Sequence, residues 1–230
     1  MAVDATLMES VVARGDCCLR FYAWSEPTVS LGYFQTVSSR VGHAPSRDCP
    51  LVRRATGGGA IVHDREITYS FVLPADHRLA ANAKSLYLLL HETLIEALAE
   101  WSLAAKVCGK QSSLSPSDEP FLCFQRRAEG DVLLGDWKIA GSAQRRRRGA
   151  VLQHGSVLLG RSSAAPELAG LVDVGGMVVT PTEMVLAWKG RLADKCQVRW
   201  RPDTLQPAEI QRSTDLVEKV FGCPAWSTRR

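Results

Sequence analysis

The sequence predicts an α+β fold with a mostly antiparallel, mixed sheet flanked by helices, and three observations lead to this prediction. β-Rich segments occur in runs rather than alternating singly with helices, which favours antiparallel pairing over a doubly wound sheet. The clearest helix, Ser85 to Trp101, stands between two such runs and has apolar residues at three- and four-residue steps. Three glycines, Gly57 to Gly59, separate two strand-like segments. With 230 residues and 46% hydrophobic composition, the chain can bury one sizeable core.

The first elements along the chain are a helix and a series of strands. Residues 1–14 are expected to be helical, with Val3, Leu7 and Val11 on one face. Strands are expected where β-branched and aromatic residues lie between turn residues, over Cys18–Trp24, Thr28–Gly32, Leu51–Arg54, Ala60–His63, Ile67–Leu73, Asp131–Leu134, Trp137–Arg146 and Ala150–Leu159. The Ser- and Pro-rich segment Gln111 to Pro120 is expected to be a loop.

The remaining elements are helices. Ser85 is the expected N-cap of the helix that ends at Trp101. Ala164–Leu171 and Glu209–Phe221 are also expected to be helical, and the second of them has an apolar face made by Ile210, Val217, Val220 and Phe221. We therefore expect a single domain over residues 1–230, with a core over residues 1–160 and a short helical extension over residues 161–230.

Composition excludes several classes of protein. Seven cysteines are scattered without a C-x-x-C pair, so neither a metal site nor a disulfide framework is expected. No segment approaches the roughly 18 apolar residues of a membrane span, and the first residues lack the basic and apolar regions of a signal peptide. We expect a cytoplasmic protein with no membrane partner. Arg145 to Arg148 supply much of the net charge of +4, but so short a run more often decorates a solvated loop than binds nucleic acid.

The glycine run lies in the segment Arg53-Arg54-Ala55-Thr56-Gly57-Gly58-Gly59-Ala60-Ile61-Val62-His63-Asp64. Backbone without Cβ atoms can adopt positive φ and can lie directly against a ligand. No Lys-Ser/Thr pair follows the glycines, so this is not a Walker A loop, and the strand that follows excludes a dinucleotide fingerprint. Taken alone, such a run more often forms a structural hairpin, because glycines in turns usually serve only the turn.

A second segment, Lys138-Ile139-Ala140-Gly141-Ser142-Ala143-Gln144 with Gln153-His154-Gly155 after it, completes a recognisable pattern. Together the two segments resemble the catalytic domain of the lipoate–protein ligase and octanoyltransferase superfamily, which also includes biotin–protein ligases. The resemblance covers roughly residues 1 to 160 and implies the biotin–lipoate ligase catalytic fold, which is similar to that of class II aminoacyl-tRNA synthetases. Family members usually carry a strand before the segment that begins at Met1 here.

The resemblance implies a role for each motif residue. Lys138 is expected to contact the acyl carbonyl, and Cys123, which precedes Phe124 as in cysteine-dependent octanoyltransferases, is the expected nucleophile. A buried apolar cysteine is the alternative for Cys123. Acyl binding is expected from Arg54, Thr56, Gly57, Gly58, Gly59, His63, Gly141, Ser142, Ala143, His154 and Gly155. Thr56 and Ser142 could donate hydrogen bonds to the carbonyl, whereas His63 and His154 are more often structural. His91 is expected to be structural or exposed, not catalytic.

The resemblance leaves three functions open. In the first, the protein moves an octanoyl group from an acyl carrier protein, through a Cys123 thioester, to a lysine of a lipoyl domain or of a glycine cleavage H-type protein, without a cofactor. The second is ATP-dependent lipoate ligation with Mg²⁺, which in this family needs an accessory domain that the 70 or so residues after Leu159 hardly provide. The third is a non-catalytic lipoyl-binding protein. Because carrier and lipoyl domains are typically acidic, Arg145 to Arg148 could steer them to the site.

Overall fold

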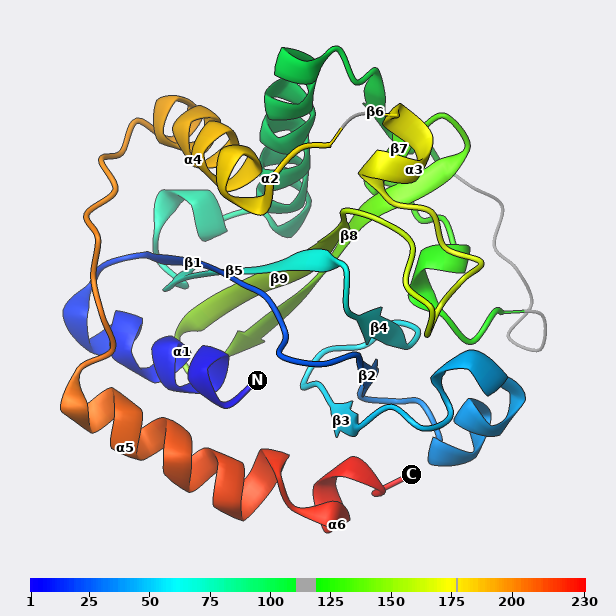
Figure 1. Cartoon of the computed structure of the whole chain (residues 1–230). Coiled ribbons are helices and arrows are strands. Elements are labelled where there is room, and N and C mark those ends of the chain that lie inside the picture. The colour runs from blue at the N-terminus through cyan, green and yellow to red at the C-terminus, as the bar shows by residue number, and fades with distance from the viewer. Residues whose placement is uncertain (111–118, 177) are drawn as a thin grey trace.

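Figure 1 shows a computed structural model that describes residues 1–110, 119–176 and 178–230; most of the expected loop at Gln111 to Pro120 lies outside them. The main sheet has the strand order β1-β5-β9-β8-β7-β6 and every neighbouring pair is antiparallel. Its strands are β1 (Cys18–Tyr22), β5 (Glu66–Pro74), β6 (Ala105–Val107), β7 (Val132–Leu134), β8 (Trp137–Arg147) and β9 (Ala150–Leu158). The α+β prediction and the antiparallel sheet are confirmed.

A separate small sheet carries the strands on either side of the glycine run. Its order is β3-β2-β4, with β2 (Thr28–Leu31) parallel to β3 (Leu51–Arg53) and antiparallel to β4 (Ile61–His63). The sequence predicted one mostly antiparallel, mixed sheet, so the division of the strands between two sheets was not predicted. Periodicity identified these strands but could not assign them to a sheet, because that depends on the path of the intervening chain.

Helices cover both faces of the main sheet (Figure 1). α2 (Ala83–Leu98) and α4 (Pro181–Cys196) pack on one face, and α1 (Ala2–Arg14) covers the other, with α5 (Pro207–Leu216) against α1. The short helices are η1 (Val37–Gly42), η2 (Ala44–Ser46), η3 (Arg78–Ala80), η4 (Ala99–Trp101), η5 (Cys123–Gln125), α3 (Leu171–Gly175), the π-helical η6 (Val217–Phe221) and α6 (Pro224–Ser227). Among the described residues, none of these helices is long and apolar enough to cross a bilayer.

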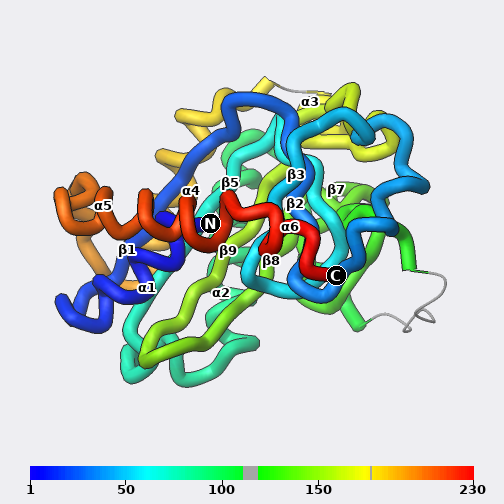
Figure 2. Tube along the Cα trace, turned by 90° about the horizontal axis from the view of Figure 1, so that it is seen from below, coloured from blue at the N-terminus to red at the C-terminus, as the bar shows by residue number. Residues whose placement is uncertain are grey.

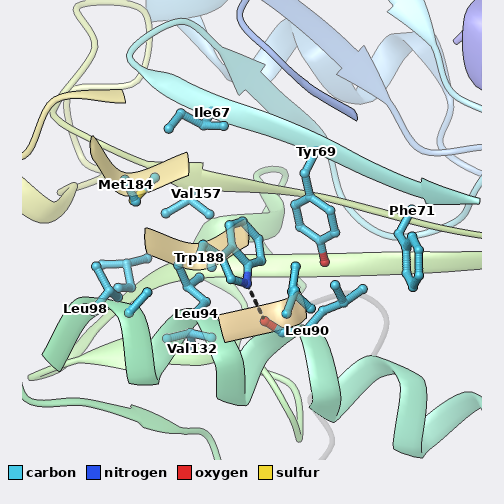
Figure 3. Close-up of a cluster of buried hydrophobic side chains, with 14 of the residues drawn as sticks. Ile67, Tyr69, Phe71, Leu90, Leu94, Leu98, Val132, Val157, Met184 and Trp188 are labelled. Atoms are coloured by element: carbon cyan, nitrogen blue, oxygen red, sulfur yellow. Dashed lines mark hydrogen bonds between the residues drawn. The ribbon is translucent and has the colours of Figure 1, made fainter. Parts of the chain in front are cut away.

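The main core joins α2 and α4 to the sheet through Trp188 (Figure 3). The Trp188 indole is fully buried, donates a hydrogen bond of 3.1 Å from Nε1 to the Leu90 carbonyl, and packs edge-on against Tyr69 at 4.9 Å. Burying so large a ring with its N–H satisfied stabilises the fold substantially. α2 begins earlier than expected, because Asn82 and not Ser85 is the N-cap and its Oδ1 accepts the Ser85 N–H at 3.0 Å.

Two helices differ from the sequence prediction. Ala164–Leu171 is not helical: an isolated bridge joins Ser162 to Ala165, and the helix α3 begins only at Leu171. Pro166 explains this, since proline disfavours helical backbone at the residue before it. α4 was not predicted, although Thr180 and Glu183 form a capping box and Pro181 stands at the first helical position.

The C-terminal helix was predicted correctly in position but not in orientation. α5 and η6 together span the expected range, yet Ile210 and Val217 are about half exposed, at 53% and 49%. The face turned toward α1 is instead polar, and there buried Glu209 accepts a 3.0 Å hydrogen bond from Arg14. After η6 the chain passes beside β3 and β2, so the C-terminal residues lie next to the small sheet (Figure 2).

Candidate active site

The glycine loop, residues 54–60 between β3 and β4, is shaped by the buried side chain of Arg54. Its Nη2 donates to the carbonyls of Gly57 at 2.9 Å and Gly59 at 2.6 Å, and its Nη1 donates to the Ser30 carbonyl at 2.8 Å. Burial lowers the pKa of Arg54 to about 10, so the guanidinium remains charged at neutral pH. The guanidinium of Arg54 therefore holds the loop in shape through hydrogen bonds to the protein's own carbonyl groups.

The three positions of the glycine run differ in whether glycine is required. Gly58 has φ +92°, and a Cβ there would lie 3.2 Å from Arg54 Nη2 and 3.8 Å from Cys123 Sγ. A Cβ on Gly59 would lie 2.9 Å from Arg126 Nε and 3.0 Å from the Cys123 nitrogen. A Cβ on Gly57 would meet the Phe34 ring at 3.7 Å and no other described residue within 4 Å. Backbone conformation thus requires glycine at 58 and close packing requires it at 59, whereas neither requires it at 57.

Cys123 is fixed against this loop by backbone hydrogen bonds. Ala60 N–H donates to the Phe121 carbonyl at 2.9 Å, and the Cys123 N–H donates to the Ala60 carbonyl at 2.7 Å. The half-buried Cys123 begins η5 and its thiol faces Gly58. The alternative of a fully buried, apolar cysteine is not what the structure shows.

Lys138, on β8, lies beside the thiol. Its ammonium is 3.9 Å from Cys123 Sγ and 3.3 Å from the Cys123 carbonyl, and its side chain is only 4% exposed. A Cβ on Gly141 would lie 2.7 Å from Lys138 Cε. Glycine at 141 thus provides the space that the lysine side chain occupies.

Sequence reasoning missed the partner of this lysine, Asp131. Lys138 Nζ is 2.8 Å from Asp131 Oδ2, and the carboxylate is itself almost fully buried. Tyr87 Oη donates to Asp131 Oδ1 at 3.1 Å, and the Ala128 N–H donates to Oδ2 at 2.7 Å. The register of the hairpin pairs Leu133 with Lys138 and Val132 with Ala140, and it shifts at a bulge between Val132 and Leu133. No local sequence pattern indicated that Asp131, just before β7, would reach the start of β8.

A cavity of about 220 Å³ adjoins these groups. Most of the predicted residues line it, namely Arg54, Gly57, Gly58, His63, Cys123, Gly141, Ser142, Ala143, His154 and Gly155. Tyr22, Ile61, Thr68, Phe124 and others complete the wall. Thr56, Gly59 and Lys138 are not among the lining residues, although Thr56 and Gly59 belong to the glycine loop. Lys138 instead lines a second cavity of about 190 Å³ that shares the Phe124 ring with the first.

His63 and His154 hold the walls of the first cavity together. His63 Nε2 lies 2.8 Å from Ser30 Oγ and its Nδ1 lies 2.7 Å from Glu66 Oε1, while Trp24 stacks on the ring at 4.3 Å. His154 Nε2 lies 2.7 Å from Thr56 Oγ1, which ties the glycine loop to β9. Burial lowers the pKa of His154.

Ser142 belongs to a chain of hydrogen bonds that fixes its proton. Burial lowers the pKa of His91 to about 4, so its ring is neutral at pH 7. His91 Nδ1 lies 2.6 Å from the Gly130 carbonyl, which can only accept, so Nδ1 carries the proton and Nε2 accepts from Ser142 Oγ at 2.5 Å. Ser142 Oγ therefore has no proton left for an acyl carbonyl. Of the two predictions for His91, structural or exposed, the first agrees with its full burial and its two hydrogen bonds. The same serine oxygen contacts Tyr69 Oη at 2.5 Å.

Among the described residues, no cluster of three or more His, Cys, Asp or Glu side chains could hold a metal ion. The site therefore consists of a thiol, a paired lysine and a glycine loop beside a cavity. Attack of a thiol on an acyl carbonyl, with a cation to stabilise the oxyanion, is the chemistry that this arrangement can perform.

Comparison with known proteins gives consistent results. A family model described as the lipoyl protein ligase A/B catalytic domain matches residues 1–167. Octanoyltransferase LipM of Kyrpidia tusciae is 37% identical over 261 residues, which cover 100% of this chain and 94% of that protein. Octanoyltransferase LipM of Moorella thermoacetica is 39% identical over 163 residues, which cover 69% of this chain and 60% of that protein.

Solved structures share the fold. Protein Ta0514 of T. acidophilum with bound lipoic acid has a TM-score of 0.80 and 25% identity, and the match covers 100% of this chain and 92% of that one. A bipartite lipoate protein ligase studied with its E2 lipoyl domain, from Thermoplasma acidophilum, has a TM-score of 0.76 and 22% identity over 99% of this chain and 89% of that one. The second likeness concerns the fold alone.

Proposed function

Because the chain belongs to the lipoyl protein ligase A/B catalytic-domain family, we propose that it is an octanoyltransferase that carries the acyl group on Cys123. Curated relatives up to 39% identical are octanoyltransferases, which makes the chain an octanoyl or lipoyl transferase enzyme. The observation that supports a cysteine route is the position of the Cys123 thiol. Cys123 lines the first cavity, and its Sγ lies 3.9 Å from the Lys138 ammonium.

In the first half of the proposed reaction, Cys123 Sγ attacks the octanoyl thioester of an acyl carrier protein. A new S–C bond forms, the carbonyl becomes an oxyanion, and the carrier thiolate leaves and takes up the proton that Cys123 lost. Lys138 can donate to the oxyanion as it develops, which is where a preorganised donor lowers the barrier most. The apolar cavity beside the glycine loop would hold the acyl chain.

Asp131 supports this role of Lys138. A buried ammonium is stable only when a carboxylate or several oxygens compensate it, and Asp131 Oδ2 at 2.8 Å provides that compensation. The hydrogen bonds from Tyr87 and Ala128 fix the carboxylate in place. Asp131 is therefore a positioning residue that directs the Lys138 ammonium toward Cys123.

In the second half, the neutral amine of an acceptor lysine attacks the Cys123 thioester. An amide bond forms, the C–S bond breaks, and the Cys123 thiolate is released as the amine loses its proton. The acceptor we propose is a lipoyl domain or a glycine cleavage H-type protein; an E2 lipoyl domain is the partner of the archaeal ligase that shares this fold. Neither half needs ATP or Mg²⁺.

ATP-dependent lipoate ligation remains the second candidate because one specific observation favours it: the fold matches a lipoate-protein ligase A bound with ATP, with a TM-score of 0.79 at 23% identity. In that case Lys138 and the glycine loop would hold an acyl-adenylate and Cys123 would be dispensable. The position of Cys123 against Gly58 and Lys138 favours transfer. The same contact argues against a non-catalytic lipoyl-binding protein.

Intact-protein mass spectrometry distinguishes the two routes. After incubation with octanoyl-carrier protein and no acceptor, we expect the wild type to gain the mass of one octanoyl group. Cys123→Ser should gain none and should fail to modify a lipoyl domain. If Cys123→Ser modified the domain normally, and only with lipoate and ATP, the protein would be a ligase.

A further inference from the structure

Beside the glycine loop lies a cluster of aromatic rings and arginines, which we call the rim surface: Tyr33, Phe34, Arg145, Trp226, Arg229 and Arg230. The Arg229 guanidinium lies over the Tyr33 ring at 4.4 Å and over the Trp226 ring at 4.8 Å. Arg230 lies 5.2 Å from the centre of the Phe34 ring, and Arg145 lies 5.9 Å from that of Tyr33. These contacts gather three guanidinium groups from two distant parts of the chain onto one surface.

The rim surface adjoins the cavity. Among the described residues, Phe34 is the side chain that a Cβ on Gly57 would touch, and Gly57 is a lining residue. The next residue, Gly58, faces the Cys123 thiol. Arg145 donates to the Ala55 carbonyl of the loop, two residues along β8 from the lining residue Ala143. The glycine loop therefore has the rim surface on one side and the reactive thiol on the other.

The tail that carries Arg229 and Arg230 is held in place. Arg53 donates to the Ser227 carbonyl at 3.0 Å from Nη2, and Trp226 Nε1 donates to the Arg53 carbonyl at 2.9 Å. The Val37 N–H donates to the Arg230 carbonyl at 3.0 Å. Figure 2 shows this C-terminal segment running beside β2 and β3. The arginines thus have a defined place on the small sheet.

The arginines of the rim surface have no acidic side chain as a partner among the described residues. Across the described residues, no ion pair joins a carboxylate to Arg145, Arg229 or Arg230. Burial, and after it the charges of Arg229 and Arg230, lower the pKa of Arg53 beneath them. Clustered like charges without counter-charges favour an anionic partner.

Resting on the proposed function, we propose that the rim surface docks the acceptor: an acidic protein domain that presents its target lysine to Cys123 across the glycine loop. A lysine amine sits at the end of only a four-carbon stem. The acceptor domain must therefore lie directly against the surface around the cavity, whereas a donor that delivers its acyl group on a longer arm need not. Acidic groups on that domain would pair with Arg229 and Arg230, and Phe34, which is 67% exposed, would supply an apolar contact.

Binding of an unmodified lipoyl domain to the catalytically inactive Cys123→Ser protein tests this docking separately from catalysis. We expect Arg229→Glu/Arg230→Glu to raise Kd about tenfold or more, and Arg229→Gln/Arg230→Gln to have an intermediate effect, with the difference shrinking at high salt. The matched control is Arg199→Glu/Arg201→Glu, which makes the same change of charge on the exposed linker between α4 and α5. Thermal midpoints of all variants should stay close to that of the parent protein.

A second measurement uses wild-type Cys123. With a soluble octanoyl thioester and a short lysine peptide, charge reversal at Arg229 and Arg230 should leave the rate unchanged, since neither substrate needs docking. The proposal is wrong if reversal weakens lipoyl-domain binding no more than the control does, or if it slows the small substrates equally. Loss of acyl carrier protein binding with lipoyl-domain binding retained would assign the surface to the donor instead. A further outcome separates the two proposals. If the protein with Cys123 intact transfers no octanoate, but charge reversal at Arg229 and Arg230 still abolishes lipoyl-domain binding, the docking surface is supported and the transferase assignment is wrong.

Discussion

Arg54 and Lys138 are two buried cations near Cys123, and they differ in what surrounds them. Arg54 donates to neutral oxygens of Ser30, Gly57 and Gly59 and has no carboxylate partner among the described residues. Lys138 is paired with Asp131 at 2.8 Å. The pair Lys138–Asp131 therefore has no net charge, whereas Arg54 has a full positive charge. Burial has the largest effect on the pKa of Arg54 and lowers it, and negative charge on Cys123 acts in the opposite direction.

This difference indicates that the two cations have different roles. The uncompensated positive charge of Arg54 acts on the Cys123 sulfur through space, since both side chains lie against Gly58. Lys138, nearly neutralised at long range, acts at short range as a hydrogen-bond donor to the oxyanion. Substitutions at the two cations should therefore affect different steps, and the following experiments test this division.

The largest effect is expected from Lys138→Met. Loss of one oxyanion donor costs about 100- to 1000-fold in rate, and leaving Asp131 buried without its partner costs about 3–5 kcal/mol of stability. Octanoyl transfer and urea unfolding measure the two effects. In the double variant with Asp131→Asn, we expect most of the stability to return but none of the activity. A double variant that regained activity would show that Lys138 has only a structural role.

Arg54→Met should act mainly on the thiol and the loop. It leaves the carbonyls of Ser30, Gly57 and Gly59 without their donor, and we expect a stability loss of about 3 kcal/mol. Alkylation of Cys123 by iodoacetamide at neutral pH should also slow. The adjacent Arg53→Met is the control, because Arg53 is equally buried but bonds to Gly32, Gln35 and Ser227. Equal alkylation rates in the two variants would contradict a through-space role for Arg54.

Acid should destabilise the Lys138 side of the site through His91, as it should destabilise the glycine-loop side through His154, because burial lowers the pKa of both histidines. Burial depresses the pKa of His91 to about 4 in the folded state, below the ordinary value of 6.5. The unfolded chain therefore takes up this proton first, and stability present above pH 6.5 is lost as the pH falls toward 4. By pH 5 the loss is about 2 kcal/mol. His91→Gln, which can keep both hydrogen bonds, should show a shallower fall in unfolding free energy between pH 7 and 5; an unchanged slope would refute this assignment.

How far the sequence predicted this site depends on the kind of contact. Local patterns identified most strands of the sheet, the helix that contains His91, and the motif residues around the cavity. Asp131 was missed because its role comes from a pairing across two strands and not from its own neighbours. Arg54 and Ser142 were assigned to the ligand, yet their donors are used within the protein. A motif indicates that a residue matters, but only its partners distinguish building the site from contacting the substrate.

The basic run Arg145 to Arg148 shows the same limit. As a sequence it is one patch, but alternate residues of a strand point to opposite faces. Arg145 turns to the glycine loop and donates to Ala55, whereas Arg146 donates to Ala80 of η3. Only Arg145 joins the rim surface, and the arginines that accompany it come from the far end of the chain.

The smallest effects should distinguish Gly57 from Gly58 within the loop that Arg54 organises. Gly58→Ala places a Cβ at φ +92° and 3.2 Å from Arg54 Nη2, so we expect it to cost about 1 kcal/mol or more and to slow alkylation of Cys123. Gly57→Ala meets only Phe34 at 3.7 Å, and its stability should change by a few tenths of a kcal/mol at most. Urea unfolding of the two variants provides the comparison. Equal destabilisation by the two substitutions would contradict this distinction. It would mean that the backbone conformation at Gly58 is not what makes this position sensitive to a side chain.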